Sequence, residues 1–265
     1  MNADIDAALS LARSAGNEIL RIYRKHPEHA RRKDDGSWLT EADLASHRHL
    51  VKGLADIEDL PVLSEEQAAP EGRTDWRRFW MIDPLDGTRD FVQRTGDFAV
   101  CIARLEGGRP TLGIIHAPFL AKTWWAEVGR GAFCRTPKGD HALAVRTPEL
   151  PERPVALTSR FHRSGGSTDR VLKQLGVHAQ RRVGSAVKFG RLAEGGADLY
   201  ARVGPTMEWD VAAGVVIVGE TGYETLSLQD GLPLRFNKSD LTNPPFLVRP
   251  VTGEPVPNLL DAPSG

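Results

Sequence analysis

Asp83-Pro84-Leu85-Asp86-Gly87-Thr88 is the stretch of this sequence that says most about its fold and chemistry. The apolar run Trp80-Met81-Ile82 before it predicts a buried strand. Pro84 lacks an N–H group and is expected to stop that strand. Asp86 then stands where a helix N-cap is favoured, and Gly87 lets a ligand approach the backbone closely. The stretch therefore predicts a strand-to-helix turn that can hold a divalent metal ion and a phosphate group.

Aspartates in such a turn often serve only as turn and capping residues. Taken alone, Asp83 and Asp86 fit that interpretation as well as they fit a role as metal ligands. Two further acidic elements favour a shared site, namely Leu63-Ser64-Glu65-Glu66 after an apolar run and Trp209-Asp210. Glu66 is interpreted as a solvated neighbour of the preceding glutamate, because adjacent strand residues face opposite ways. We expect four carboxylates to converge, those of Glu65, Asp83, Asp86 and Asp210.

Length and composition exclude several classes of protein. The 265 residues predict one compact unit with two lobes. Lysines and arginines (34) nearly balance aspartates and glutamates (35), so no long-range field favours nucleic acid or an acidic membrane surface. Cys101 and Cys134 fit no zinc spacing, no secretory signal is recognised, and no apolar run approaches the roughly 18 residues of a membrane span. We expect a cytoplasmic protein, and leave open peripheral association at the inner membrane and the choice between monomer and homodimer.

Periodicity predicts the elements of the N-terminal half. Apolar positions at helical spacing predict a long helix from Ile5 to Tyr23, and Thr40 with Asp43 predicts a capping box that opens a second helix ending near Asp56. The polar segment 31–37 is interpreted as a mobile basic loop that could act as a lid. Short β-rich runs predict a mainly antiparallel sheet, with strands at 79–82, 98–105, 111–116, 123–128 and around 132, and a hairpin turn at 107–108.

The C-terminal half follows a different pattern. Prolines between 137 and 154 favour a lobe boundary, so we expect an N-terminal α+β lobe over 1–145 and a C-terminal α/β lobe over 146–250. In the second lobe we expect strands at 155–158 and 197–203, and helices at 168–175, 185–193 and 210–218. Residues 244–263 are proline-rich without periodicity. We interpret 251–265 as a tail that is disordered after Val256.

Four carboxylates are too many to leave unpaired in a partly buried site, and a metal ion is the simplest remedy. Oxygen ligands without nearby cysteine or histidine pairs favour Mg²⁺. Two ions roughly 4 Å apart could clamp a phosphoryl group while water attacks it. Thr88 and Asp43 are candidates for orienting that water, because a hydroxyl–carboxylate pair can accept its proton. Their alternative roles are a helix-start hydroxyl and a plain capping residue.

With the Asp-Pro-x-Asp-Gly-Thr turn, the upstream Glu65-Glu66 and the downstream Trp209-Asp210, the chain resembles the inositol monophosphatase superfamily over most of its length. Residues 61–66, 83–91, 184–189 and 204–206 are similar to its subgroup of CysQ-type 3′(2′),5′-bisphosphate nucleotidases. The resemblance implies a mixed α/β fold, an αβαβα layered sandwich with the active site between two lobes.

The resemblance also implies removal of the 3′-phosphate from adenosine 3′,5′-bisphosphate to give AMP, with 3′-phosphoadenylyl sulfate as a related substrate. It implies two or three Mg²⁺ ions and inhibition by lithium. One ion would be held by Glu65, Asp83 and the Leu85 carbonyl, and a second by Asp83, Asp86 and Asp210. The catalytic residues would be Thr88, Asp43 and Glu65. The substrate, a small phosphorylated nucleotide, would contact Glu65, Leu85, Asp86, Gly87, Thr88, His162, Ser185, Lys188, Arg202 and Asp210.

Two departures leave the substrate open. The subgroup usually has a second serine where this chain has Ala186, and Glu208 adds an acid near the expected phosphate site. Lys188 and Arg202 could be ordinary solvated charges, and His162 a surface or packed residue. Phosphatases of inositol 1-phosphate or histidinol phosphate are the rival enzymes on the same metal centre. A protein that binds a phosphorylated ligand without turnover is the non-enzymatic alternative, and the lack of a basic stripe disfavours nucleic-acid binding.

Overall fold

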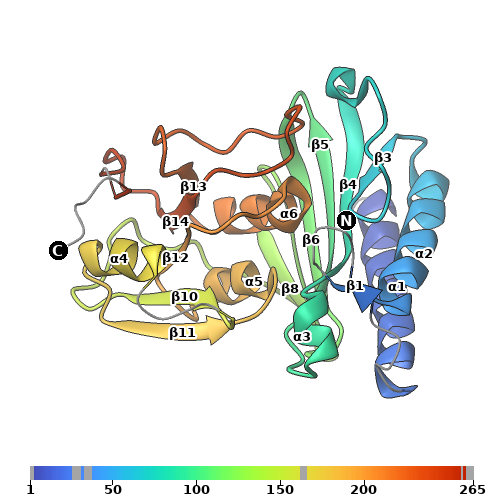
Figure 1. The fold of residues 1–265 in the computed structure, drawn as a ribbon, viewed down its shortest axis with the longest axis horizontal. Coiled ribbons are helices and arrows are strands. Elements are labelled where there is room, and N and C mark those ends of the chain that lie inside the picture. Colours follow the sequence, from blue (N-terminus) through green and yellow to red (C-terminus); the bar gives the residue numbers. More distant parts are fainter. Residues whose placement is uncertain (1–2, 26–30, 33–37, 162–165, 258, 261–265) are drawn as a thin grey trace.

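The structure, a computed structural model, describes residues 3–25, 31–32, 38–161, 166–257 and 259–260 (Figure 1). Within these ranges the strands form a seven-stranded sheet, a five-stranded sheet and a two-stranded pair. Helices cover the outer face of each large sheet and fill the space between the two sheets (Figure 1). The predicted αβαβα sandwich is confirmed.

The first helical layer consists of α1 (Ala3–Lys25) and α2 (Glu41–Ile57), which pack against each other and against the seven-stranded sheet. Thr40 is the N-cap of α2, and Asp43 completes the capping box, so both predicted helices are confirmed. The predicted loop 31–37 is wrong at its first two residues, since β1 (Arg31–Arg32) pairs with β2 (Trp38–Leu39). Each of these strands has only two residues, which is too short for an alternation of apolar and polar residues to appear in the sequence. Residues 33–37, and with them the predicted lid, lie outside the described residues.

The seven-stranded sheet carries the acidic turns. Its strands, in spatial order, are β3 (Val62–Ser64), β4 (Arg78–Asp86), β5 (Ala99–Glu106), β6 (Arg109–Ala117), β7 (Lys122–Glu127), β8 (Ala132–Thr136) and β9 (Gly139–Ala142). β3 runs parallel to β4, and the remaining neighbours are antiparallel, as predicted. Trp80 and Ile82 on β4 face α1 and α2, whereas Phe79 and Met81 face the central helices. Because both faces are buried, the run 79–82 of this strand is apolar at every position.

Pro84 does not end β4, which continues to Asp86. The register shifts between Asp83, which pairs with Cys101, and Asp86, which pairs with Ala99. Two residues of β4 therefore oppose one residue of β5, which is a β-bulge. Pro84 lies in this bulge, where its missing N–H interrupts no ladder hydrogen bond.

The central layer consists of α5 (Val187–Ala193) and α6 (Glu208–Gly219), which pack between the two large sheets. The five-stranded sheet has the order β11 (Ala179–Val183), β10 (Val155–Ser159), β12 (Leu199–Arg202), β14 (Phe246–Pro250) and β13 (Tyr223–Ser227). α4 (Ser167–Gln174) covers the outer face of this sheet. The predicted α4, α6, β10 and β12 are confirmed within a few residues, while α5 begins two residues later than expected.

The proline-rich segment 244–263 contains a strand that the sequence did not predict. Phe246–Pro250 is β14, which is paired with β12 on one side and β13 on the other, and Leu259 is buried. Phe246, Leu247 and Val248 are all buried because helices cover both faces of the sheet, so the strand shows no alternation. β9 also lies inside the segment expected to be a lobe boundary. Residues 143–154 connect the two large sheets, and the division at residue 145 stays a prediction.

Candidate active site

The turn after β4 projects the acidic residues toward the start of the central helices. Asp86 is the last residue of the strand, and α3 (Thr88–Val92) begins after Gly87, so the prediction that Asp86 caps this helix is wrong. Gly87 itself is the N-cap, with φ at 89°. A Cβ atom there would lie 2.9 Å from the Asp97 carbonyl oxygen. Both the conformation and the space therefore require glycine.

Three of the four predicted carboxylates meet at one point. Oxygens of Glu65, Asp83 and Asp210 all lie within 4.8 Å of one another. Glu65 follows β3, Asp83 lies on the neighbouring β4, and Asp210 is in the first turn of α6. Asp83 accepts a hydrogen bond from the Leu85 amide at 2.9 Å. Asp210 accepts one from the Met207 amide at 2.8 Å, which orients its side chain.

Asp86 lies on the side of this group that faces the start of α5. Its Oδ2 accepts a short hydrogen bond from the Ala186 amide. Burial raises the pKa of Asp86 to about 6, while Lys188 opposes the shift. Glu65 also raises the pKa of Asp86, so the structure places the fourth carboxylate within electrostatic reach of the others.

The carboxylates destabilise one another as anions. Burial is the first cause that raises the pKa of Asp83 well above its ordinary value, followed by the charges of Glu65, Asp86 and Asp210. Burial and the charges of Asp86 and Glu65 likewise raise the pKa of Asp210. A cation would relieve both the burial cost and the repulsion. The donors are all oxygens, which fits Mg²⁺ better than a softer metal.

These pKa shifts predict how stability depends on pH. An acid whose pKa is raised by folding stabilises the fold below its unfolded pKa, and this stability is lost as pH rises through the folded pKa. In chelator, Asp43, whose pKa is raised to about 7, should therefore lower the free energy of unfolding by roughly 0.8 kcal/mol between pH 6.5 and 8. Asp83 and Asp210, whose pKa values burial raises well above the ordinary value, should lower it further. Buried His116 and Lys188, whose pKa values are lowered to about 4 and about 8, act in the opposite direction by roughly 0.4 kcal/mol each.

Urea unfolding in chelator at the two pH values measures this difference, and excess Mg²⁺ should reduce it. Equal stability at pH 6.5 and 8 in chelator would contradict the proposed clustering of carboxylates.

Asp43 and Thr88 are joined as the sequence predicted. The Thr88 hydroxyl lies 3.1 Å from Asp43 Oδ1 and 3.1 Å from the Leu85 carbonyl oxygen. Asp43 Oδ2 accepts hydrogen bonds from the Thr40 amide at 2.7 Å and the Thr40 hydroxyl at 2.6 Å. Asp43 is therefore a capping residue and a partner of Thr88 at once. Burial raises its pKa to about 7, which suits a group that exchanges protons near neutral pH.

The predicted cationic residues reach the same cavity. A cavity of about 180 Å³ is lined by Asp86 and Asp210 together with Ser185, Lys188 and Arg202. Lys188 is buried, and its ammonium group donates to the Ser185 carbonyl at 2.6 Å. Burial lowers its pKa to about 8. Arg202 donates to the carbonyls of residues 204 and 205 at 3.2 and 3.1 Å. His162 lies outside the described residues.

Sequence reasoning missed several residues of the site. Ser159, Tyr200 and Thr206 also line the cavity. The signal for Ser159 was its position at the carboxyl end of a strand, and for Thr206 its place just before Trp209-Asp210.

Two residues of α2 that contact the acidic turns were also missed. Ser46 donates to the Pro84 carbonyl at 2.7 Å, and His47 lies 2.8 Å from the Ser64 hydroxyl. Both follow Asp43 by one helical turn, so helical spacing could have placed them on its face.

Two expectations about neighbouring acids are corrected. Glu208 adds no charge to the phosphate region, because its side chain is fully buried and paired with Lys238 at 2.5 Å. Glu66 lies with Glu65 in a turn after β3, so strand alternation does not govern its direction. Its charge contributes to the raised pKa of Asp43, which places Glu66 near the Asp43–Thr88 pair.

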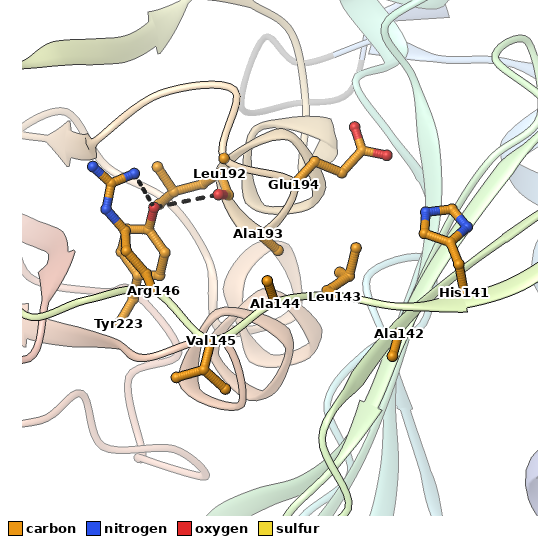
Figure 2. Close-up of a pocket in the computed structure, with 11 residues that line it drawn as sticks. His141, Ala142, Leu143, Ala144, Val145, Arg146, Leu192, Ala193, Glu194 and Tyr223 are labelled. Atoms are coloured by element: carbon orange, nitrogen blue, oxygen red, sulfur yellow. Dashed lines mark hydrogen bonds between the residues drawn. The ribbon is translucent and has the colours of Figure 1, made fainter.

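A larger cavity of about 440 Å³ lies elsewhere, between the segment after β9 and the end of α5 (Figure 2). Its main polar groups are already paired. Arg146 donates to the Tyr223 hydroxyl at 3.1 Å and pairs with Asp198, and the Tyr223 hydroxyl lies 3.4 Å from the Leu192 carbonyl (Figure 2). The candidate active site is therefore the smaller cavity beside the carboxylates.

None of the helices in the described ranges combines the length and apolar character that crossing a bilayer requires.

Residues 1–252 match the inositol monophosphatase family. The 3′(2′),5′-bisphosphate nucleotidase CysQ of Salmonella typhimurium is 39% identical over 251 residues, covering 92% of this chain and 98% of that protein. The CysQ of Escherichia coli strain K12 is 37% identical over 250 residues, with the same coverage.

Solved structures agree with these relatives. CysQ from Bacteroides thetaiotaomicron, described as a bacterial member of the inositol monophosphatase family, superposes with a TM-score of 0.80 at 33% identity. The alignment covers 92% of this chain and 96% of that one. An IMPase from Thermotoga maritima gives a TM-score of 0.76 at 25% identity, covering 94% and 92% of the two chains.

Proposed function

Because the chain belongs to the inositol monophosphatase family, we propose that it is a 3′(2′),5′-bisphosphate nucleotidase that hydrolyses adenosine 3′,5′-bisphosphate to AMP and phosphate. The related 3′-phosphoadenylyl sulfate is proposed as a second substrate. Bisphosphate nucleotidases at 33–39% identity over most of the chain support the activity.

The observation that carries this proposal is one cavity lined by both carboxylates and cations. Asp86 and Asp210 line it together with buried Lys188 and partly buried Arg202. A monophosphate of an uncharged alcohol has no need of these cations. A substrate with two phosphates needs a separate anion site, and Lys188 with Arg202 and the Ser185 hydroxyl supplies suitable donors.

Mg²⁺ is the proposed metal. Glu65, Asp83 and the Leu85 carbonyl would hold one ion, and Asp83, Asp86 and Asp210 a second. When bound, these ions would lower the pKa of water and neutralise charge on the phosphoryl oxygens. The number of ions, two or three, is a proposal from the family resemblance.

The chain's own groups have distinct proposed roles in the reaction. The Thr88 hydroxyl and Asp43 carboxylate accept the proton of the attacking water, whose oxygen forms the new bond to phosphorus. The bond from phosphorus to the 3′ oxygen breaks, and that oxygen leaves with the 5′-nucleotide and takes up a proton. The amides of Gly87 and Thr88 bind the scissile phosphate, and Lys188 with Arg202 binds the 5′-phosphate.

The deciding experiment compares phosphate release from adenosine 3′,5′-bisphosphate, inositol 1-phosphate and histidinol phosphate, each with Mg²⁺, with chelator and with added lithium. We expect a strong preference for the nucleotide, dependence on Mg²⁺ and inhibition by lithium. Preference for another phosphate would refute the substrate but keep the metal mechanism. No release from any substrate would favour a protein that only binds a phosphorylated ligand.

Lys188→Met tests the second phosphate site. Loss of a buried ammonium group should raise KM for adenosine 3′,5′-bisphosphate about tenfold or more, because a charged hydrogen bond to phosphate is lost. KM for 2′-AMP or 3′-AMP, which lack the 5′-phosphate, should change much less. Lys173→Met, at an exposed position on α4, is the matched control. Equal losses for bisphosphate and monophosphate substrates would contradict the assignment of Lys188.

The oligomeric state and the cytoplasmic location stay predictions from the sequence.

A further inference from the structure

The proposed metal centre takes its ligands from two parts of the chain. Glu65 follows β3 and Asp83 lies on β4, whereas Asp210 belongs to α6, more than a hundred residues later. Their carboxylate oxygens lie within 4.8 Å of one another, and like charges at this distance repel each other. Contacts outside the carboxylate group therefore help to hold the start of α6 in place.

Glu208 is the best-held residue at the start of α6. Its side chain is fully buried, two residues before Asp210, where the helix turns it away from the metal centre. Its carboxylate accepts hydrogen bonds from the Asn237 amide at 2.6 Å and from the Lys238 amide at 3.1 Å. The Lys238 ammonium group donates to it at 2.5 Å. The segment 237–238 thus wraps around this one carboxylate.

Asn237 continues the contact toward the first half of the chain. Its side-chain carbonyl accepts from Arg73 at 3.0 Å, and its side-chain amide donates to the backbone carbonyls of Arg73 at 3.0 Å and Thr74 at 3.3 Å. Arg73 is 5% exposed and donates to the carbonyls of Lys238 at 2.5 Å and Ser239 at 2.8 Å. Each of the two segments, 73–74 and 237–239, therefore both donates hydrogen bonds to the other and accepts them from it.

Arg73 lies in the chain between two of the proposed metal ligands, Glu65 and Asp83. It begins the short 3₁₀ helix η1 (Arg73–Asp75), in the connection between β3 and β4. Glu65 stands at the start of this connection and Asp83 lies on the strand after it. Arg73, Asn237 and Glu208 therefore form a hydrogen-bonded strut from the connection between Glu65 and β4 to the helix that bears Asp210.

We propose that this strut, Arg73–Asn237–Glu208, consists of positioning residues that fix Asp210 against Glu65 and Asp83 and so set the affinity of the site for Mg²⁺. The inference rests on the proposed function for the identity of the metal. None of the three residues is assigned to the metal or to the substrate, so their effect is exerted through the place of α6.

If these contacts only stabilised the fold, a buried carboxylate with three hydrogen-bond donors would not be needed at this position. Burying a carboxylate is costly, and apolar residues of similar volume often stabilise a fold equally well. What the buried charge adds is a defined geometry, because three donors converge on it from one loop. That geometry is useful where a rigid distance matters, as it does between ligands of one metal ion.

Two variants test the strut at different points. Glu208→Gln keeps the size of the side chain but removes the charge that Lys238 contacts. Asn237→Gly removes the side chain that contacts Arg73, while the backbone conformation is retained, because φ at Asn237 is 62° and glycine adopts this region readily. The Asn237 amide can still donate to Glu208 in the second variant. If Glu208→Gln fails to fold, Asn237→Gly decides alone.

Glu220→Gln is the matched control. Glu220 lies at the opposite end of the same helix, and its carboxylate accepts the backbone amides of Gly129 at 3.0 Å and Gly131 at 2.8 Å. It offers the same chemistry on the same helix, about 18 Å of helical rise away from Glu208.

Mg²⁺ affinity is measured on the full chain by calorimetric titration and by the Mg²⁺ dependence of the thermal midpoint. We expect the Mg²⁺ dissociation constant to rise about tenfold or more in Glu208→Gln and Asn237→Gly, and less than twofold in Glu220→Gln. In the phosphatase assay, the Mg²⁺ concentration for half-maximal rate should rise in parallel, while KM for substrate at saturating Mg²⁺ stays within threefold of wild type.

Mg²⁺ affinity in both strut variants within twofold of wild type would overturn the proposal, as would a wild-type chain that binds no Mg²⁺. Loss of stability in chelator without loss of Mg²⁺ affinity would also overturn it, because that result marks a merely structural role. A wild-type chain that binds Mg²⁺ but releases no phosphate would refute the proposed function, and the weaker Mg²⁺ binding of the variants would still support the strut.

Discussion

Replacing Asp83 with asparagine is expected to lower kcat/KM for the bisphosphate substrate on the order of 1000-fold at fixed Mg²⁺. Asp83 is proposed to contact both metal ions, and one of its oxygens lies within 4.8 Å of oxygens of Glu65 and Asp210. Asparagine preserves the volume and the acceptor for the Leu85 amide, but it removes the charge. The loss should therefore come from the metal centre rather than from misfolding.

A second consequence separates these causes. In chelator the asparagine variant should be more stable than wild type near pH 8, because Asp83 is buried and repelled by its neighbours. Phosphate release and urea unfolding measure the two effects. Asp56→Asn, at an exposed position on α2, is the matched control and should change neither. Activity that survives Asp83→Asn would remove the proposed mechanism.

Asp43→Asn should lower kcat by about 100-fold or more, with little change in KM, because the pair that accepts the proton of water is lost. Thr88→Val should have a similar effect, since it removes the hydroxyl that lies 3.1 Å from Asp43. Thr88→Ser keeps the hydroxyl and should retain most of the rate. If the two residues act as one unit, the double variant should be no slower than the slower single variant.

The pH profile gives an independent check. Below its pKa, which burial raises to about 7, Asp43 is protonated and cannot accept a proton, so the wild-type rate should fall on the acid side of neutrality. This acid limb should disappear in Asp43→Asn. An acid limb that persists in Asp43→Asn would contradict the role of Asp43 as the proton acceptor. Rate losses that multiply in the double variant would show that Asp43 and Thr88 do not act as one unit.

Local patterns accounted for the amphipathic helices and for the hairpins. α1 and α2 pack one side against the sheet, so their apolar residues recur at helical spacing and both helices were predicted closely. The hairpins β5 to β7 were predicted from short β-rich runs and a Gly-Gly turn, although their strands are buried on both faces. β14 was missed because its short apolar run is flanked by prolines and has no hairpin turn before it.

The candidate metal ligands could also be proposed in advance, because hard oxygen donors are a property of residue type. Their arrangement could not. Thr88 meets Asp43 across 45 residues and the Ala186 amide meets Asp86 across 100, and such pairs depend on how the layers pack. Packing also decided the position of Glu208. The sequence predicted this residue near the phosphate site, but its side chain is buried and pairs with Lys238.

Residue types along the chain thus determine which chemistry is possible here, since charge, hydrogen-bonding capacity and backbone freedom belong to each residue alone. Which carboxylates lie together, which become buried partners of a loop, and how far burial moves their pKa values were decided only by packing. The physical reason is that desolvation and Coulomb interactions depend on the distances between groups in space. The bulge at Pro84 and the packing of α6 against the sheet set those distances.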